Sequence, residues 1–217
     1  MDLFETMRTM RAMRRLKPDP VPRELIARVV EAGTCAPSGG GLQTWAFIAV
    51  DDADLKRQIG AQVVRWFDAM LAQMGITPEI RTQMMAADTP EARNGRALNY
   101  LVQHMHEVPV ILLCCVAVDY PPYANDLGRR TGASLGTQHA TIYPAVQNIL
   151  LACRALGLGS CLTTMQFFFE AELKQLLGVP ETMEISALLP IGYPKGKFGP
   201  IQRRPVEESL HWNRFRS

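Results

Sequence analysis

Two kinds of hydrophobic pattern run along the chain, and each predicts a different element. Leu25, Ile26, Val29 and Val30 recur at helical spacing, which predicts a helix over 22–33. Continuous apolar runs predict buried strands over 45–50 and 110–118, and a last central strand is predicted over 184–193. Further helices are predicted over 55–106, 142–156 and 167–178, with a short strand over 161–164. Because helices and strands alternate irregularly, the pattern predicts one α+β domain over 1–217, with a mixed sheet covered by helices.

Prolines and glycines separate these elements. Three prolines at alternate positions within 17–22 force extended backbone after a first helix that is expected to carry the arginines up to Arg15. Thr77 and Pro78 interrupt the helical region 55–106. Three successive glycines follow Ser38 in a loop, and a polar, glycine-containing stretch over 120–136 follows the strand at 110–118.

Composition narrows the class of protein. Of the 217 residues 47% are hydrophobic and 20% charged, as in ordinary globular proteins, and 23 Lys and Arg against 21 Asp and Glu give a net charge of +2. This balance gives no support for a nucleic-acid partner. The longest apolar run, 108–118, is about half a membrane span, and the N-terminus lacks the apolar region of a signal peptide. We therefore expect a cytoplasmic protein with no membrane partner.

Several familiar kinds of site are not indicated. The five cysteines form no C-x-x-C pair, so they are expected to be reduced and buried, with Cys114 and Cys115 on opposite faces of their strand. The four histidines do not converge with other ligands, and no metal site is predicted. The glycines at 157 and 159 lack the third glycine of a dinucleotide fingerprint and follow a helix instead of a strand. No hydrolase signature is present.

Arginines at opposite ends of the chain give a positive signal. Arg11, Arg14 and Arg15 have the i, i+3, i+4 spacing that gathers side chains on one helix face, and Arg203 and Arg204 lie near the C-terminus. Arginine suits bidentate capture of phosphate. The loop 37–43 lies between the two clusters and could close its backbone N–H groups on a flat polar ligand. By composition alone, however, a solvated basic face is the more common interpretation of such arginines.

Four segments in a fixed order carry a more specific signal. They are RAMRRLKPDPV at 11–21, APSGGGLQTWAF at 36–47, YPAVQNILLA at 143–152 running to ALGLG at 155–159, and IGYP at 191–194 followed by RRPVEE at 203–208. Together they resemble the nitroreductase family of FMN-dependent oxidoreductases over most of the chain.

The resemblance implies an α+β fold with a mostly antiparallel central sheet covered by helices, in an interlocked homodimer with two FMN molecules at the interface, each contacted by both chains. Arg11, Ala12 and Arg14 would hold the phosphate end and the flavin edge, and Arg203, with Arg204 beside it, would grip the phosphate. Further expected flavin contacts are a loop around the ring and ribityl chain and a backbone segment near the reactive nitrogen: Pro37, Ser38, Gly39, Gly40, Gly41 and Gln43, and then Leu162, Thr163 and Thr164.

The implied activity is hydride transfer from NADH or NADPH through FMN to an electron-poor small molecule such as a nitroaromatic or a quinone, with ping-pong kinetics. Arg14 is expected to stabilise negative charge on the reduced flavin, and no protein acid or base is predicted. The region 60–106 is expected to form a helical lid over the pocket, and 199–217 a C-terminal tail.

Three positions depart from the family pattern. Ala12 stands where the family usually has Ser, Gly41 where it has Asn, and Thr44 where it has Pro. These changes keep a second hypothesis open, in which the fold performs other flavin chemistry: reductive dehalogenation, flavin fragmentation or desaturation of a metabolite. A third hypothesis, of another class, is a protein that binds an anionic ligand or nucleic acid through the arginine helix.

Overall fold

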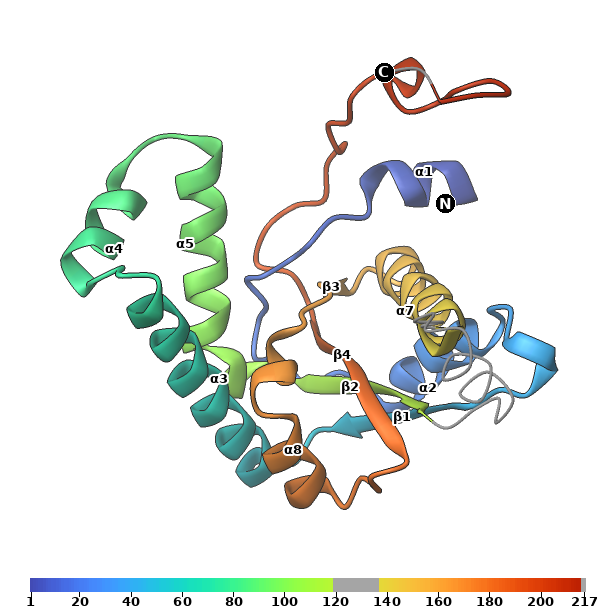
Figure 1. Ribbon diagram of the computed structural model, residues 1–217, viewed down its shortest axis with the longest axis horizontal. Coiled ribbons are helices and arrows are strands. Elements are labelled where there is room, and N and C mark those ends of the chain that lie inside the picture. The colour runs from blue at the N-terminus through green and yellow to red at the C-terminus, as the bar shows by residue number, and fades with distance from the viewer. Residues whose placement is uncertain (119–136, 216–217) are drawn as a thin grey trace.

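A four-stranded sheet forms the centre of the protein. The computed structural model describes residues 1–118 and 137–215, so the polar stretch expected over 120–136 lies outside the described residues. Its sheet has the order β1-β2-β4-β3 (Figure 1), made by β1 (Trp45–Val50), β2 (Val110–Ala117), β4 (Met183–Gly192) and β3 (Gly159–Ser160). The three strands predicted over 45–50, 110–118 and 184–193 are confirmed. Every pairing among these strands is antiparallel, so the part of the sheet described is not mixed.

Strand β2 separates two hydrophobic cores. Ile111, Leu113 and Cys115 pack in one core, whereas Leu112 and Cys114 pack in the other. The period of two along a strand sends neighbouring side chains to opposite faces, and the prediction for the two adjacent cysteines is confirmed. Four of the five cysteines are buried as expected, but Cys35 is exposed.

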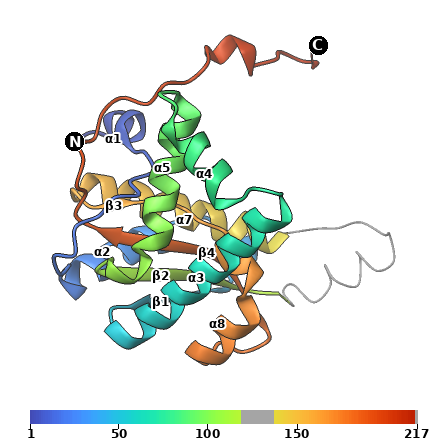
Figure 2. The same cartoon turned by 90° about the vertical axis from the view of Figure 1, so that its left-hand side faces the viewer.

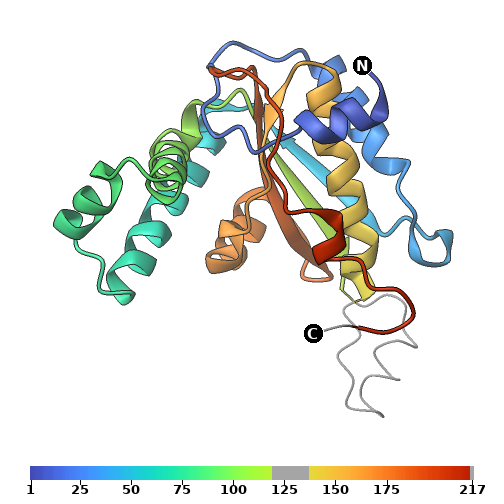
Figure 3. The same ribbon diagram turned by 90° about the horizontal axis from the view of Figure 1, so that it is seen from above.

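One face of the sheet is covered by α2 (Arg23–Thr34) and α7 (Thr137–Ala155), which lie together in Figure 3. The helix predicted over 22–33 is thereby confirmed, and the one predicted over 142–156 begins earlier. The two helices approach closely at Gly33, where a Cβ atom would lie 2.8 Å from Cγ1 of Ile149. This contact needs a glycine, which explains its position near the end of an otherwise apolar helix face.

The opposite face is covered by α3 (Ala53–Gln73), whose Ile59, Val63 and Phe67 are buried. The chain then forms α4 (Pro78–Ala86) and α5 (Pro90–Gln103), which reach away from the sheet (Figures 1 and 2). The break expected at Thr77 is confirmed, because its side chain caps α4 and Pro78 begins the helix. The same arrangement recurs at Thr89 and Pro90, a second break that the sequence analysis missed.

The first helix is shorter than expected. Helix α1 (Leu3–Thr9) carries Arg8 but ends before Arg11, so Arg11, Arg14 and Arg15 lie outside the helix and do not share a helix face. The reason is non-local: Met13 N donates to Ser160 O at 3.0 Å, and Leu16 forms an isolated bridge with Pro194. Residues 11–16 therefore lie beside the sheet edge, where the side chains of Met13 and Leu16 are buried.

The C-terminal third differs from the prediction in its details. The short strand expected over 161–164 is displaced to β3, with only Thr163 bridging to Leu188. The helix expected over 167–178 is a 3-10 turn, Met165–Phe168, followed by α8 (Glu170–Leu177), which ends at Gly178 with a φ of 67°. No helix within 1–118 or 137–215 is long and apolar enough to cross a membrane.

The C-terminal tail leaves the body of the molecule above α1 (Figures 1 and 2). Its only regular element within the described chain is a 3-10 turn, Val206–Glu208. Trp212 and Phe215 are 71% and 82% exposed there, and Phe4 of α1 is 68% exposed. Large apolar side chains so accessible at both termini mark a surface suited to association.

Candidate functional site

Arg14 lies beside the segment that follows β3. Met13 is held to Ser160 by its main-chain hydrogen bond, which fixes the neighbouring Arg14 close to Cys161. Burial raises the pKa of the Cys161 thiol to about 11, and the charge of Arg14 opposes that rise. The charge of Arg14 is therefore felt at Cys161, the first residue after β3.

The tail returns to the N-terminal segment in antiparallel register. Lys17 N donates to Tyr193 O at 2.7 Å, Lys195 N to Arg15 O at 2.9 Å, and Ile201 N to Arg8 O at 2.9 Å. The fold therefore brings the chain around Arg203 back to the N-terminus. It does so beside Arg8, a residue that the sequence analysis did not assign to the site.

The candidate arginines differ in their partners. In the part of the chain that the structure describes, Arg11, Arg14 and Arg203 form no ion pair with a carboxylate, whereas Arg204 lies 3.6 Å from Glu208. Arg203 uses one N–H to reach the carbonyl oxygen of Gln202 at 2.8 Å. Three guanidiniums thus keep donors for an anion, and Arg204 is partly neutralised.

The segment Leu162–Thr164 offers fewer free groups than expected. Thr163 exchanges main-chain hydrogen bonds with Leu188, both at 3.1 Å, and its hydroxyl donates to Leu188 O at 2.9 Å. Thr163 therefore has a structural role. Among the described residues, the N–H of Thr164 has no hydrogen-bond acceptor, so this group can face a ligand.

The glycine loop also differs from the expected cradle of free N–H groups. Gly39 N donates to Thr141 Oγ1 at 3.3 Å, Gly41 N to Ser38 O at 2.9 Å, and Gln43 N to Ser38 Oγ at 2.8 Å. These three donors are consequently used inside the fold. What remains open is the surface at Gly41, where a Cβ would have no neighbour within 4 Å, and the exposed side chain of Gln43.

These two halves of the candidate site lie at opposite ends of α7. Thr141, near its beginning, contacts the glycine loop, whereas Arg154, near its end, donates to Thr9 Oγ1 at 3.0 Å beside the arginine segment. The helix rises about 20 Å between these two residues. One chain therefore does not bring Gly41 to Arg14.

Two supporting residues had no signal in the sequence. Thr141 holds a loop 102 positions away, and a lone threonine in a helix predicts no such contact. Ser160 supplies the carbonyl oxygen that holds Met13, and its buried Oγ has no partner in the described chain. A buried hydroxyl without a partner is costly, and it lies next to the arginine segment.

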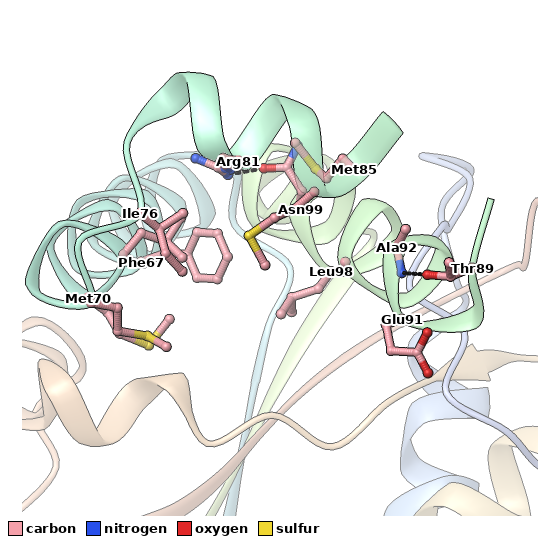
Figure 4. Close-up of a pocket in the computed structure, with 14 residues that line it drawn as sticks. Phe67, Met70, Ile76, Arg81, Met85, Thr89, Glu91, Ala92, Leu98 and Asn99 are labelled. Atoms are coloured by element: carbon pink, nitrogen blue, oxygen red, sulfur yellow. Dashed lines mark hydrogen bonds between the residues drawn. The ribbon is translucent and has the colours of Figure 1, made fainter. Parts of the chain in front are cut away.

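The helices α3, α4 and α5 enclose a cavity of about 360 Å³ with a largely apolar lining (Figure 4). Met70 and Leu98 form part of its wall. Arg81 of α4 and Asn99 of α5 lie together where these two helices face each other. The sequence analysis assigned no methionine of this region to the site, because methionines at helical spacing are usually core residues.

Comparison with known proteins decides the family. The model of the nitroreductase family matches residues 7–193. The chain belongs to the nitroreductase family. The match includes the N-terminal arginines, the glycine loop and the segment after β3, so the family resemblance drawn from the sequence is confirmed.

Nitroreductase-family relatives of this chain carry different names. The chain is 27% identical over 208 residues to an NADH dehydrogenase of Thermus thermophilus, covering 93% of this chain and 91% of that one. It is 28% identical over 215 residues to a 5,6-dimethylbenzimidazole synthase of Rhodospirillum rubrum, covering 97% and 87%. The crystal structure of oxidized iodotyrosine deiodinase bound to FMN and 3-iodo-L-tyrosine has a TM-score of 0.72 at 23% identity, covering 99% of this chain and 100% of that one. That last similarity shows the α+β fold alone.

Proposed function

We propose that this nitroreductase-family protein is an FMN-dependent oxidoreductase of the nitroreductase type. It would use NADH or NADPH to reduce an electron-poor small molecule, a nitroaromatic or a quinone, by ping-pong kinetics. When bound, FMN supplies the redox chemistry, since it can take a hydride from the nicotinamide and pass two electrons to the acceptor. The observation that carries the proposal is that Arg11, Arg14 and Arg203, which have no described carboxylate partner, belong to two chain segments that the fold brings together.

The donor set fits this cofactor. A phosphate monoester carries about two negative charges near neutrality, and Arg11, Arg14 and Arg203 offer guanidinium donors that no described carboxylate occupies. The unpartnered Oγ of Ser160 lies next to the same segment. Arg14 would orient the ring and stabilise negative charge on its pyrimidine side, and Thr164 N–H would donate to the ring edge.

The site is proposed to be completed by a second copy of the chain. The glycine loop and Arg14 lie at opposite ends of α7. In a two-fold dimer, the glycine loop of each chain would lie over the arginine segment of the other chain, so that two equivalent sites would form. The exposed apolar residues of α1 and the tail, Phe4 and Trp212 among them, would be buried in that interface. The chain would then act as a cytoplasmic homodimer with one FMN for each chain.

Purification and simple assays test the proposal. The protein should be yellow, with one non-covalent FMN per chain, and should oxidise NADH or NADPH when nitrofurazone or menadione is added. Gel filtration should give the mass of a dimer. A colourless protein that takes up no FMN on titration would contradict it.

A second candidate is different flavin chemistry, namely dehalogenation, flavin fragmentation or desaturation of a metabolite. The open surface at Gly41, which carries no side chain to meet a substrate, favours it, as do relatives named for 5,6-dimethylbenzimidazole synthase and iodotyrosine deiodinase. Photoreduced protein that neither nicotinamide can reduce would support this candidate. The nucleic-acid hypothesis loses its basis, because the helix that was to present four arginines ends at Thr9.

A further inference from the structure

The cavity between α3, α4 and α5 has apolar walls, and no side chain of the protein fills it. Met74 and Met84 line it and are 65% and 57% exposed. Helix α4 buries none of its residues, so the wall of the cavity that α4 forms is not anchored in the hydrophobic core. Methionine side chains adapt to the shape of a ligand, and a cavity of about 360 Å³ is within the range of small-molecule sites.

One polar corner gives the cavity a preferred orientation for a ligand. Arg81 donates to Asp68 Oδ1 at 3.0 Å and also to Asn99 Oδ1 (Figure 4). Since the amide oxygen of Asn99 accepts from Arg81, its NH₂ group points elsewhere. The corner therefore offers donors, and it suits an uncharged oxygen acceptor such as a carbonyl or an ether, because Asp68 already balances the charge of Arg81.

This cavity continues toward the candidate flavin site. A second cavity of about 220 Å³ is lined by Trp66, Thr164 and Phe168. The two cavities share Phe67, Met70 and Leu98 as lining residues. The two cavities therefore adjoin, and together they would form an apolar passage from Thr164, whose N–H is expected to face the flavin, to the methionine-lined space under α4.

We propose that this passage binds the apolar arm of the electron acceptor, and that the acceptor is a quinone with an alkyl or prenyl substituent. The inference rests on the proposed function for the position of the quinone ring, at Thr164. The substituent extends past Phe67 and Leu98 and covers the exposed faces of Met74 and Met84. A short acceptor such as a simple nitroaromatic leaves this space empty.

A series of benzoquinones with the same ring and lengthening alkyl chains tests the inference. The ratio of kcat/KM for the decyl compound to kcat/KM for the unsubstituted compound should be tenfold or more, because each buried methylene can contribute up to about fourfold. Equal values across the series would overturn the inference while leaving the proposed function intact.

Gly95 offers a matched pair of variants. It lies on α5 in the cavity lining, and a Cβ there would meet nothing within 4 Å. Gly95→Leu should therefore fill the cavity without a clash, and leucine favours a helix over glycine. We expect the decyl-to-unsubstituted ratio to fall to near one in Gly95→Leu and to be largely retained in Gly95→Ala. A ratio unchanged in Gly95→Leu would contradict the proposed passage.

A binding measurement separates this inference from the proposed function. Calorimetric titration of the oxidised, flavin-loaded protein with decylbenzoquinone needs no nicotinamide and no turnover. Binding that is at least tenfold weaker in Gly95→Leu than in Gly95→Ala supports the passage even if no quinone is reduced. The absence of quinone reduction would contradict only the proposed activity. Equal binding by the two variants would overturn the passage.

Discussion

The main-chain N–H of Ile201 donates to the carbonyl oxygen of Arg8 at 2.9 Å. Together with the hydrogen bond from Lys195 N to Arg15 O, this bond joins the C-terminal tail to the N-terminal segment and brings the tail back beside the N-terminal arginines. Few buried contacts hold the tail near these arginines, since most of its residues are exposed. A phosphate site composed of Arg11, Arg14 and Arg203 depends on this return.

Arg203 is predicted to hold the FMN phosphate. Replacing it by Ala should weaken FMN binding roughly ten- to hundredfold, because a hydrogen bond to a charged group contributes about 1.5–3 kcal/mol. Riboflavin, which lacks the phosphate, should bind Arg203→Ala and the wild type about equally. The measurement is flavin fluorescence titration. Arg204→Ala is the matched control and should have the smaller effect, since Arg204 lies 3.6 Å from Glu208; the reverse order would assign the phosphate to Arg204.

Arg14 is predicted to act on the flavin ring. Arg14→Met should weaken the binding of riboflavin as well as that of FMN, and should shift the midpoint potential of the bound flavin to more negative values. A loss of about 1.4 kcal/mol in stabilisation of the reduced anion corresponds to about 30 mV for a two-electron couple. Arg14→Lys keeps the charge and should lie between the two, as spectroelectrochemical titration can measure. A potential identical in all three proteins would remove Arg14 from the catalytic role.

The sheet could be predicted from the sequence because its strands are locally encoded. Strands β1 and β2 are continuous apolar runs, and Cys114 and Cys115 follow the alternation that two covered faces require. Helix α2 was equally visible from its apolar face. The helix predicted for the N-terminal segment was wrong for a physical reason. Arg11, Arg14 and Arg15 have helical spacing, but the backbone conformation of this segment is set by hydrogen bonds to Ser160 and Tyr193. Those partners lie far away in the sequence.

The family pattern names the residues of the candidate site but does not give their geometry. The family pattern led to the glycine loop, but the expectation of free N–H groups overlooked the Ser38 hydroxyl, which accepts from Gln43 N at 2.8 Å and closes the loop on itself. Similarly, nothing in the local sequence indicated that the main-chain groups of Thr163 would form hydrogen bonds with Leu188. The separation of the two half-sites along α7 is a property of the fold alone.

Cysteine reactivity should divide sharply between one exposed and four buried thiols. Cys35 is exposed, whereas burial raises the pKa of Cys115 to about 11 and of Cys153 to about 12. At pH 8.5, iodoacetamide should therefore modify one thiol in the folded chain and five in urea, and Cys35→Ser should reduce the folded count to zero. Mass spectrometry reads the count, and a second labelled cysteine in the folded protein would contradict the buried environment.

The same thiols predict how stability depends on pH. Their pKa values are raised on folding, so the unfolded chain loses these protons first, near the ordinary value of about 8.5. The contribution of these thiols to the free energy of unfolding should be constant below that pH and should fall between about pH 9 and 11, by about 1 kcal/mol per pH unit for each such thiol. Urea denaturation at pH 7.5, 9 and 10 measures the trend; a stability that rises over this interval would contradict it.

Gly159 couples the sheet edge to the arginine segment. A Cβ at this position would lie 2.8 Å from Leu16 Cδ2 and 3.0 Å from Met13 Cβ. Gly159→Ala should therefore push the segment away from β3, lower the free energy of unfolding by about 1–3 kcal/mol and weaken FMN binding through the displaced Arg14. Gly196→Ala is the control, because its nearest contact, Met13 Cε, is at 3.8 Å. Thermal melts and FMN titration should separate the two variants, and equal behaviour would show that the segment tolerates the added methyl group.

Gly41 tests whether the departure from the family pattern sets the chemistry. Its φ of 71° is in the left-handed region, which Asn tolerates better than most residues, and a side chain there meets nothing within 4 Å. Gly41→Asn should therefore fold, and its amide should tighten FMN binding about fivefold, the effect of one net hydrogen bond of about 1 kcal/mol. Gly41→Ala adds a Cβ in the same strained backbone without the amide, so it should bind FMN no more tightly than the wild type. The decisive comparison is the rate of nitrofurazone reduction: a gain in Gly41→Asn alone means that the missing amide tunes the site, and identical rates in the three proteins would show that residue 41 reaches neither flavin nor substrate.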